Sequence, residues 1–341
     1  MKKSAVTIKD LAKELGISPS TVSRALNDHP DISVETKKEV NDLAKRLNYE
    51  PNVVAQNLRS QKTHTIGVII PEIVHFFFST VISGIEEVAY NAGYTVMFCQ
   101  TSESYEREVK DTKALLNQRI DGMIASFSKE TTNFDHFKEV ANKIPLVLFD
   151  RETDDLDVSK VIVDDYYGAA IATQHLIDQG YSKIAHLAGP ENLIISAERK
   201  RGYEETLSKN NLRITPEYIL PCFKGTMDEG YHAMKRLIDL PNRPDAVFAN
   251  NDMAAYGAMK AIKDEGLNIP NDIGITGFSN WQFSSLIDPQ LTTVAQPGVE
   301  MGRAAARRLI LELEAKNETP KPTTQVLKTD LIIRESTRKE K

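Results

Sequence analysis

A helical spacing of apolar residues dominates the first fifty residues of the chain. Three successive segments repeat the spacing i, i+3, i+4, which lines one face of an amphipathic helix. The apolar positions are Ile8, Leu11, Ala12 and Leu15 in the first segment, Val22, Ala25 and Leu26 in the second, and Val40, Leu43, Ala44 and Leu47 in the third. The chain is therefore expected to begin with three short helices around a small core.

Capping residues predict where these helices begin and end. Thr7 is expected to cap the first helix, and Gly16 is expected to end it. Ser18 is a good cap for the second helix, and Pro19 at the first helical position loses no hydrogen bond. Ser33 is expected to cap the third helix. Two short helices joined by a turn that contains glycine are typical of a helix-turn-helix.

The outer face of the second helix is polar and carries small side chains. Ser20, Ser23, Arg24 and Asn27 share this face at helical spacing. A helix with such a face can lie in the major groove of DNA, where the guanidinium of Arg24 can pair with a guanine. The alternative is an ordinary helical hairpin whose polar side chains only face water.

Longer stretches of the sequence favour the DNA-reading interpretation. The string TIKDLAKELGISPSTVSRALN, followed by NYEPNVVAQNLRS, resembles the N-terminus of the LacI/GalR family of bacterial transcription regulators. The resemblance continues along essentially the whole chain. It implies a DNA-binding headpiece over residues 1–50. The DNA contacts that it implies there are Thr7, Pro19, Ser20, Thr21, Ser23, Arg24 and Asn27.

Residues 51–62 are expected to form a hinge helix or linker. The segment has one apolar face, but a helix this short is only marginally stable alone in water. The resemblance implies that it pairs with its twin in a homodimer and that Leu58 wedges between base pairs in the minor groove. Asn52, Ala55 and Gln56 are the other DNA contacts expected from this segment. The alternative for Leu58 is packing against the next domain.

From Thr65 the pattern changes to short apolar strands that alternate with helices. The candidate strands lie at 65–70, 94–100, 122–126, 145–149, 160–164, 183–189, 245–250 and 272–278. Near-continuous apolar strands separated by helices are typical of parallel sheets covered on both faces. The predicted fold class is α/β: an all-α headpiece and hinge helix, then a two-lobed domain similar to the periplasmic-binding-protein-like effector domain of the family.

Two series of strands predict two lobes within residues 63–341. The expected boundaries are about 63–163 and 292–322 for lobe 1, and about 164–291 and 323–341 for lobe 2. The segments 291–297 and 326–336 are expected to cross between the lobes. Ligands of such folds bind beyond the carboxyl ends of the strands, which here means in the cleft between the lobes.

Candidate effector contacts in the first lobe follow the predicted strands. Phe77 and Phe78 match family positions that contact the effector, and their aromatic faces suit sugar rings or bases. Core packing is the alternative for each. Asp150 and Arg151 end the fourth strand and can bind hydroxyl groups or pair with each other.

Candidate contacts in the second lobe include an arginine and short polar side chains. Arg199 matches the arginine that holds a sugar hydroxyl or a carboxylate in many family members, with an interlobe ion pair as the alternative. Asn250, Asn251 and Asp252 follow a buried strand, although Asp252 can instead cap the next helix. These residues are expected to face the cleft.

The sequence departs from the family pattern at two positions of the expected site. Ser279 stands where many relatives carry an acidic residue that grips the effector, and Gly225 stands where they carry an aromatic residue. Trp281, the only tryptophan of the chain, can replace hydrogen bonding by stacking. These two departures leave the identity of the effector open. A sugar or sugar derivative is expected on the resemblance alone.

Composition adds limits to this interpretation. The net charge of -6 is unevenly distributed, since residues 1–60 hold 10 Lys and Arg against 8 Asp and Glu, whereas the other 281 residues hold 32 against 40. The excess of positive charge is small even in the headpiece, so charge alone would not identify a DNA-binding protein. The two cysteines, Cys99 and Cys222, indicate neither a disulfide framework nor a zinc site.

Motifs for catalysis, cofactors or metals are not found in the sequence. GxGxxG, GxxxxGK[ST] and HExxH are absent, so no catalytic residue, cofactor or metal ligand is expected. The N-terminus lacks the apolar region of a signal peptide, and no apolar run approaches 18 residues. We expect a cytoplasmic protein that associates with the nucleoid when bound to DNA, and no membrane partner.

Three hypotheses of function remain, and the first is preferred. The protein is expected to be a homodimeric repressor that reads a near-palindromic operator and whose DNA affinity a small molecule controls. A soluble sugar-binding protein of a transport system would share the two-lobed fold, but the headpiece and the missing secretory signal disfavour it. An enzyme on this fold is the third hypothesis, which turnover of a bound ligand would support.

Overall fold

The computed structural model describes residues 6–49, 62–315 and 320–338. The chain divides into two compact units, Met1–Thr63 and His64–Lys341. The expected hinge residues Asn52, Ala55, Gln56 and Leu58 lie outside the described residues. Each unit is described below by itself.

The first unit contains the three expected helices, α1 (Ile8–Leu15), α2 (Pro19–Leu26) and α3 (Val34–Arg46). The predicted caps are confirmed. Gly16 ends α1 in the left-handed conformation with φ 67°, and Ser18 Oγ accepts the amide proton of Thr21 at 3.1 Å. The buried core joins residues of all three helices: Leu11, Ala12, Val22, Ala25, Val40, Leu43 and Ala44.

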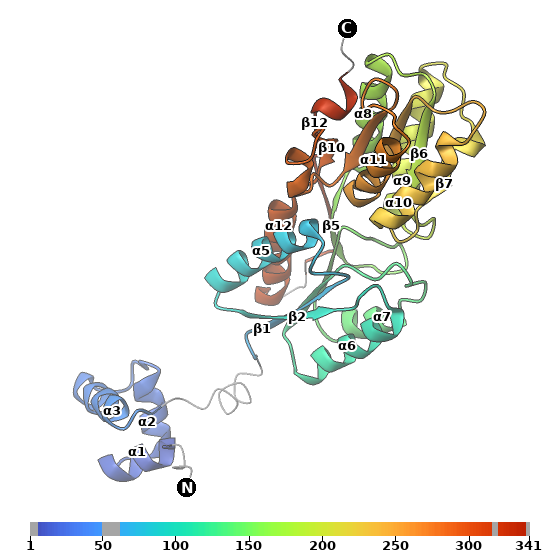
Figure 1. The fold of residues 1–341 in the computed structure, drawn as a ribbon. Coiled ribbons are helices and arrows are strands. Elements are labelled where there is room, and N and C mark those ends of the chain that lie inside the picture. Colours follow the sequence, from blue (N-terminus) through green and yellow to red (C-terminus); the bar gives the residue numbers. More distant parts are fainter. Residues whose placement is uncertain (1–5, 50–61, 316–319, 339–341) are drawn as a thin grey trace. The chain divides into compact units, whose positions relative to one another are not determined.

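The first sheet of the second unit is entirely parallel, with the strand order β11-β5-β4-β3-β1-β2. Its strands are β1 (Thr65–Ile70), β2 (Thr95–Gln100), β3 (Gly122–Ala125), β4 (Leu146–Phe149), β5 (Ser159–Val163) and β11 (Thr324–Leu327). One face packs against α5 (Phe76–Asn91) and α12 (Gly298–Glu314), and the other against α6 (Tyr105–Asn117) and α7 (Asp135–Ala141) (Figure 1). We call this layered body lobe 1.

The second sheet has the order β12-β10-β9-β8-β6-β7 and is parallel except for β12. Its strands are β6 (Ile184–Ala188), β7 (Ile219–Pro221), β8 (Ala246–Ala249), β9 (Gly274–Phe278), β10 (Thr292–Ala295) and β12 (Asp330–Ile332). One face packs against α8 (Asp165–Asp178) and α9 (Ile194–Lys209), and the other against α10 (Met227–Ile238) and α11 (Asp252–Asp264). This body is lobe 2, and β7 is a strand that the apolar pattern did not predict.

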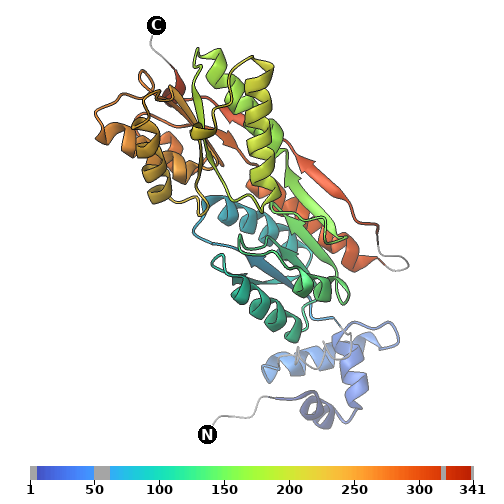
Figure 2. The same cartoon turned by 90° about the vertical axis from the view of Figure 1, so that its right-hand side faces the viewer.

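The crossing segments connect the lobes differently from the sequence-based expectation. β10 pairs with β9 in lobe 2, α12 then packs on lobe 1, and β11 pairs with β5 in lobe 1 before β12 returns to lobe 2 (Figure 2). The expected placement of residues 292–295 in lobe 1 and of 324–327 in lobe 2 is therefore wrong. An apolar strand pattern shows that a segment pairs, but it does not show with which of two sheets.

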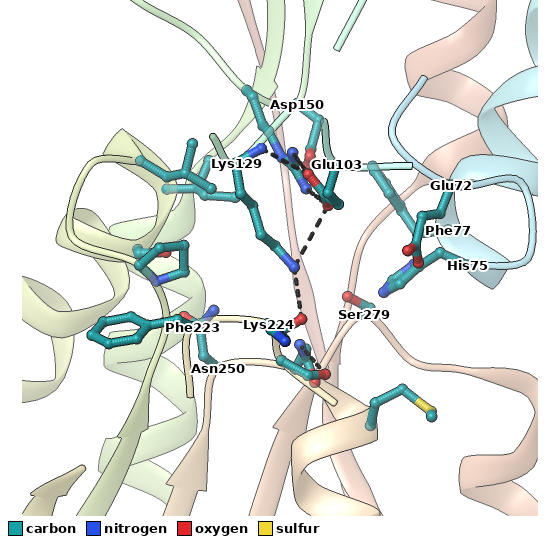
Figure 3. A pocket seen from close by; sticks show the side chains of 18 of the residues that line it. Glu72, His75, Phe77, Glu103, Lys129, Asp150, Phe223, Lys224, Asn250 and Ser279 are labelled. Carbon is teal, nitrogen blue, oxygen red and sulfur yellow. Dashed lines mark hydrogen bonds and ion pairs between the residues drawn. The ribbon is translucent and has the colours of Figure 1, made fainter. Parts of the chain in front are cut away.

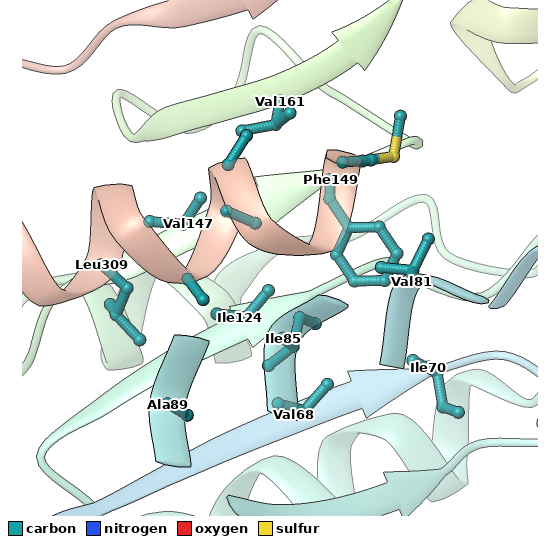
Figure 4. Close-up of a cluster of buried hydrophobic side chains, with 14 of the residues drawn as sticks. Val68, Ile70, Val81, Ile85, Ala89, Ile124, Val147, Phe149, Val161 and Leu309 are labelled. Carbon is teal, nitrogen blue, oxygen red and sulfur yellow. The ribbon is translucent and has the colours of Figure 1, made fainter. Parts of the chain in front are cut away.

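Glycines bring pairs of helices into backbone contact. A Cβ atom on Gly84 of α5 would lie 2.0 Å from the carbonyl oxygen of Val299 in α12, and a Cβ on Gly257 of α11 would lie 1.8 Å from that of Met227 in α10. Only glycine permits such close approach. Between α12, α5 and the sheet of lobe 1, a dense apolar core includes Leu309, Val147, Ile85 and Phe149 (Figure 4).

Candidate functional site

A cavity of about 770 Å³ lies beyond the carboxyl ends of the strands of both lobes. Loops that follow β1, β2, β3 and β4 contribute one side of its wall, and loops that follow β6, β7, β8 and β9 contribute the other (Figure 3). Of the residues predicted from the sequence, those that line the cavity are Phe77, Phe78, Asp150, Arg151, Arg199, Asn250, Asn251, Ser279 and Trp281. This is the position at which parallel α/β folds bind ligands.

In lobe 1, Arg151 pairs with a residue that the sequence analysis missed. Its Nη1 and Nη2 atoms donate to the two carboxylate oxygens of Glu103, each at 2.8 Å, and Nη1 also donates to the carbonyl of Phe127 at 2.6 Å. Burial is the largest single influence on Glu103 and opposes its ionisation, but the charges and hydrogen bonds of Arg151 and Lys129 together outweigh burial and lower the pKa of Glu103 to about 2. Glu103 follows β2, so the strand-end rule that selected Arg151 could also have selected Glu103.

Asp150 is a buried carboxyl that forms no ion pair with an arginine of the described residues. Gln296 Nε2 donates to its Oδ1 at 3.3 Å, and only 6% of Asp150 is exposed. Its backbone is in the left-handed region with φ 60°, which Asp adopts more readily than most residues. Burial raises the pKa of Asp150. The alternative in which Asp150 pairs with Arg151 is not what the structure shows.

In lobe 2, Arg199 is fixed by three contacts within its own lobe. Its Nε and Nη2 atoms lie 2.7 Å from Oδ1 of Asp165, and Nη1 donates to the carbonyl of Asn250 at 2.7 Å. The guanidinium also lies 3.6 Å from the ring centroid of Phe278. Burial raises the pKa of Asp165 to about 7, although Arg199 opposes this shift. Arg199 and Asp165 both belong to lobe 2, so Arg199 does not form the interlobe ion pair that was the alternative in the sequence analysis.

The side chain of Asn251 occupies the space next to Gly225, the position at which the resemblance led us to expect an aromatic residue. The Asn251 side chain caps α11 by accepting the amide proton of Ala254 at 2.8 Å, and it donates to the carbonyl of Gly225 at 3.1 Å. Gly225 has φ 65°, and a Cβ atom there would lie 2.2 Å from Nδ2 of Asn251. No larger residue fits this position without moving Asn251. Phe223, which the sequence analysis did not select, lines the cavity nearby and is 54% exposed.

Asp252 does not line the cavity, contrary to the sequence-based expectation. It is fully buried, and its carboxylate accepts hydrogen bonds from the amide of Trp281 at 2.6 Å, Ser284 Oγ at 2.9 Å and Thr293 Oγ1 at 2.6 Å. It is not the helix cap either, because Asn251 has that role. Asp252 instead fixes the segment that carries Trp281.

Ser279 and Trp281 shape the wall at the crossing segment. Ser279 Oγ donates to Oε1 of Gln296 at 2.7 Å, so its hydroxyl is engaged within the protein. The ring of Trp281 meets that of His75 edge to face, with 4.8 Å between centroids. His75 belongs to lobe 1 and also contacts the ring of Phe78, so aromatic rings from both lobes meet beside the cavity.

Five buried polar atoms of the cavity wall have no hydrogen-bond partner within the described chain. They are Nδ1 of His75, Nε of Arg151, Oγ of Ser196, Oδ1 of Asn250 and Nε1 of Trp281. Buried polar groups are normally paired, so such atoms mark places where a polar ligand can supply the partner. In the part of the chain that the structure describes, no group of His, Cys, Asp and Glu side chains could hold a metal ion.

The outer face of α2 is available to a partner. Pro19, Ser20, Arg24 and Asn27 are exposed, as is Thr7 before α1, whereas Thr21 and Ser23 are half-buried. Ser18 Oγ lies within hydrogen-bond distance of the hydroxyls of Ser20 and Thr21, at 2.6 and 2.8 Å. Among the described residues Arg24 forms no ion pair, so its guanidinium is free to pair with an external group.

Comparison with known proteins identifies the family. Residues 7–52 match the model for bacterial regulatory proteins of the lacI family, and residues 63–332 match that for periplasmic binding proteins and the sugar binding domain of the LacI family. The chain belongs to the LacI family. It is a helix-turn-helix transcriptional regulator with a periplasmic-binding-protein-like domain.

Relatives of known name cover the whole chain. The Bacillus subtilis (strain 168) protein named "Probable HTH-type transcriptional repressor ExuR" is 37% identical, over 98% of this chain and 99% of that protein. The HTH-type transcriptional repressor CytR of Escherichia coli (strain K12) is 34% identical, over 99% and 98%. Both relatives are named as helix-turn-helix transcriptional repressors.

Solved structures agree with this assignment. A lac repressor dimer bound to operator and the anti-inducer ONPF matches with a TM-score of 0.86 and 26% identity, over 98% of this chain and 99% of that one. The complex of the transcriptional regulator CelR with cellobiose matches with a TM-score of 0.74 and 27% identity, over 97% and 99%. Among the described residues, none of the helices has the length and apolar character that a membrane span requires.

Proposed function

We propose that the protein is a homodimeric repressor that binds a near-palindromic operator and releases it when a sugar or sugar derivative occupies the cleft. In this proposal the protein acts in the cytoplasm, at the nucleoid when bound to DNA. The observation that carries the effector half of the proposal is the wall of the cavity, where aromatic rings lie beside buried polar atoms that have no partner.

The chemistry of the wall supports a polyhydroxylated ligand. The rings of Trp281 and Phe78 offer apolar faces that suit the C–H face of a sugar ring. Hydroxyl groups of such a ligand can donate to the carboxyl of Asp150 and to Oδ1 of Asn250. They can also accept a charge-assisted hydrogen bond from Nε of Arg151. The Lac repressor and CelR structures hold ligands in the same family fold, which supports the site without identifying the ligand.

The exposed face of α2 supports the DNA half of the proposal. Arg24 is placed to make a bidentate contact with a guanine, which is worth about 1–3 kcal/mol of discrimination. Pro19 offers no side-chain hydrogen bond, so we infer that DNA shape and the segment around Leu58 supply the rest of the specificity. Two headpieces in a dimer would read two half-sites, which makes the operator near-palindromic.

Gel-shift titration of the full chain with its own promoter region tests this proposal. We expect salt-dependent binding at nanomolar to micromolar protein, which a sugar from a screened panel weakens. The Arg24→Ala variant should show a relaxed sequence preference at one or two base positions. The control is Lys138→Met, which changes an exposed lysine of α7 in the second unit and should bind DNA like the parent. No binding at low salt would contradict the proposal.

A further inference from the structure

Lys129 joins the two lobes at the side of the cavity opposite to the crossing segments. Its Nζ atom donates to the carbonyl of Lys224 at 2.7 Å, and its own carbonyl accepts from Nδ2 of Asn192 at 2.6 Å. Lys129 follows β3 in lobe 1, whereas Asn192 and Lys224 follow β6 and β7, at the edge of the second sheet that lies farthest from β10 and β12. Figure 3 shows the Lys129 side chain extending between the strand ends of the two lobes.

The ammonium of Lys129 lies closer to its acceptor in the other lobe than to its ion-pair partner in its own lobe. Glu103 Oε1 lies 3.5 Å from Nζ, and both oxygens of Glu103 already accept hydrogen bonds from Arg151 at 2.8 Å. The Lys224 carbonyl is closer and belongs to lobe 2. A partly buried ammonium needs hydrogen-bond acceptors, so separating the lobes would cost Lys129 its closer acceptor and leave the longer contact with Glu103.

We propose that Lys129 is a latch that holds the cleft closed before a ligand binds. This inference rests on the proposed function, because it concerns regulation of the same effector cleft. The latch biases the equilibrium between open and closed lobes, and loss of one charge-assisted hydrogen bond shifts such an equilibrium about tenfold. A ligand oxygen that reaches Lys129 would replace the Lys224 carbonyl, so ligand binding and latch opening are linked.

The chain carries its own reporter of lobe closure. Trp281 is the only tryptophan of the 341 residues, and it belongs to lobe 2. Its ring packs edge to face on that of His75 from lobe 1, at 4.8 Å between centroids. Opening the cleft separates these rings and exposes the indole to solvent. Fluorescence of Trp281 therefore reports on the latch in the whole protein and requires neither operator nor effector.

Acrylamide quenching of Trp281 in the ligand-free full chain tests the latch. Lys129→Met should raise the Stern–Volmer quenching constant about twofold, because the lobes open more often. Asn192→Ala should raise it as well, since it removes the second hydrogen bond between Lys129 and lobe 2. Lys138→Met is the matched control, because Lys138 is an exposed lysine of α7 whose ion pair within the described residues is with its helix neighbour Asp135; its quenching should equal that of the parent.

A quenching constant for Lys129→Met equal to that of the parent, with the fold verified by circular dichroism, would overturn the latch. Should Lys129→Met fail to fold, Asn192→Ala carries the same test with the same two outcomes. The measurement uses no DNA and no sugar. Failure of the latch is therefore distinguishable from failure of the proposed repressor function, which the gel-shift titration measures separately.

Discussion

At the scale of single residues, the cavity wall is built from pairs that the sequence could indicate only in part. The position at the end of an apolar strand found Arg151, and the match to a family position found Arg199, which lies within α9. They could not find Asp165 as the partner of Arg199, because the two residues lie on different helices and meet only in the folded lobe. For the same reason Asp252 was expected in the cavity, although its carboxylate holds Trp281 and Thr293 instead.

His186 gives a residue-scale prediction about pH. It is fully buried between the rings of Tyr203 and Phe248, at centroid distances of 5.1 and 4.9 Å, and burial lowers its pKa to about 4. The unfolded chain takes up a proton near pH 6.5 and the folded chain does not, so the contribution of neutral His186 is present above pH 6.5 and is lost as pH falls towards 4. The loss amounts to roughly 3 kcal/mol over this window.

The measurement is urea unfolding of the parent and of His186→Leu at several pH values from 7 to 4. Because His75 also has a pKa lowered by burial, to about 3, the parent should lose stability from both histidines. The His186→Leu variant should lose less stability over the same range, whatever its stability at pH 7. Parallel curves for the two proteins would contradict a neutral, buried His186.

At the scale of elements, local signals predicted most of the secondary structure. Caps such as Ser18 and Gly16 and the apolar strand runs act within a few residues, so the helices of the headpiece and eight strands of the lobes follow from the sequence. β7 escaped because its three residues include Pro221. The partners of β10 and β11 could not be predicted, because pairing depends on the positions of both sheets.

Backbone contact between α10 and α11 gives a prediction at this scale. Gly257→Ala would place a Cβ 1.8 Å from the carbonyl oxygen of Met227, so the helices must separate. On an open helix surface the same change would stabilise the protein by about 1 kcal/mol. Here we expect a loss of about 3 kcal/mol from overpacking, measured by denaturant unfolding.

The exposed Lys260→Ala on the same helix is the control. It removes an ion pair with Asp264 and the contact of the ammonium with the ring of Tyr231 in α10, so it should cost at most about 1 kcal/mol, less than Gly257→Ala. A Gly257→Ala protein as stable as the parent would show that α10 and α11 do not pack as closely as the structure indicates.

At the scale of the whole molecule, a helix-turn-helix unit is joined in one chain to a domain with a ligand cavity. Thermodynamic linkage requires that a ligand which weakens operator binding by some factor is itself bound more weakly, by the same factor, when operator is present.

The most direct test measures both sides of this linkage with the full chain, its operator and a sugar found by screening. Fluorescence anisotropy of labelled operator gives the operator affinity with and without the sugar, and calorimetry gives the sugar affinity with and without operator. We predict that both affinities fall by one common factor of about 5 to 150. A sugar that binds the cleft and leaves operator affinity unchanged would contradict the account.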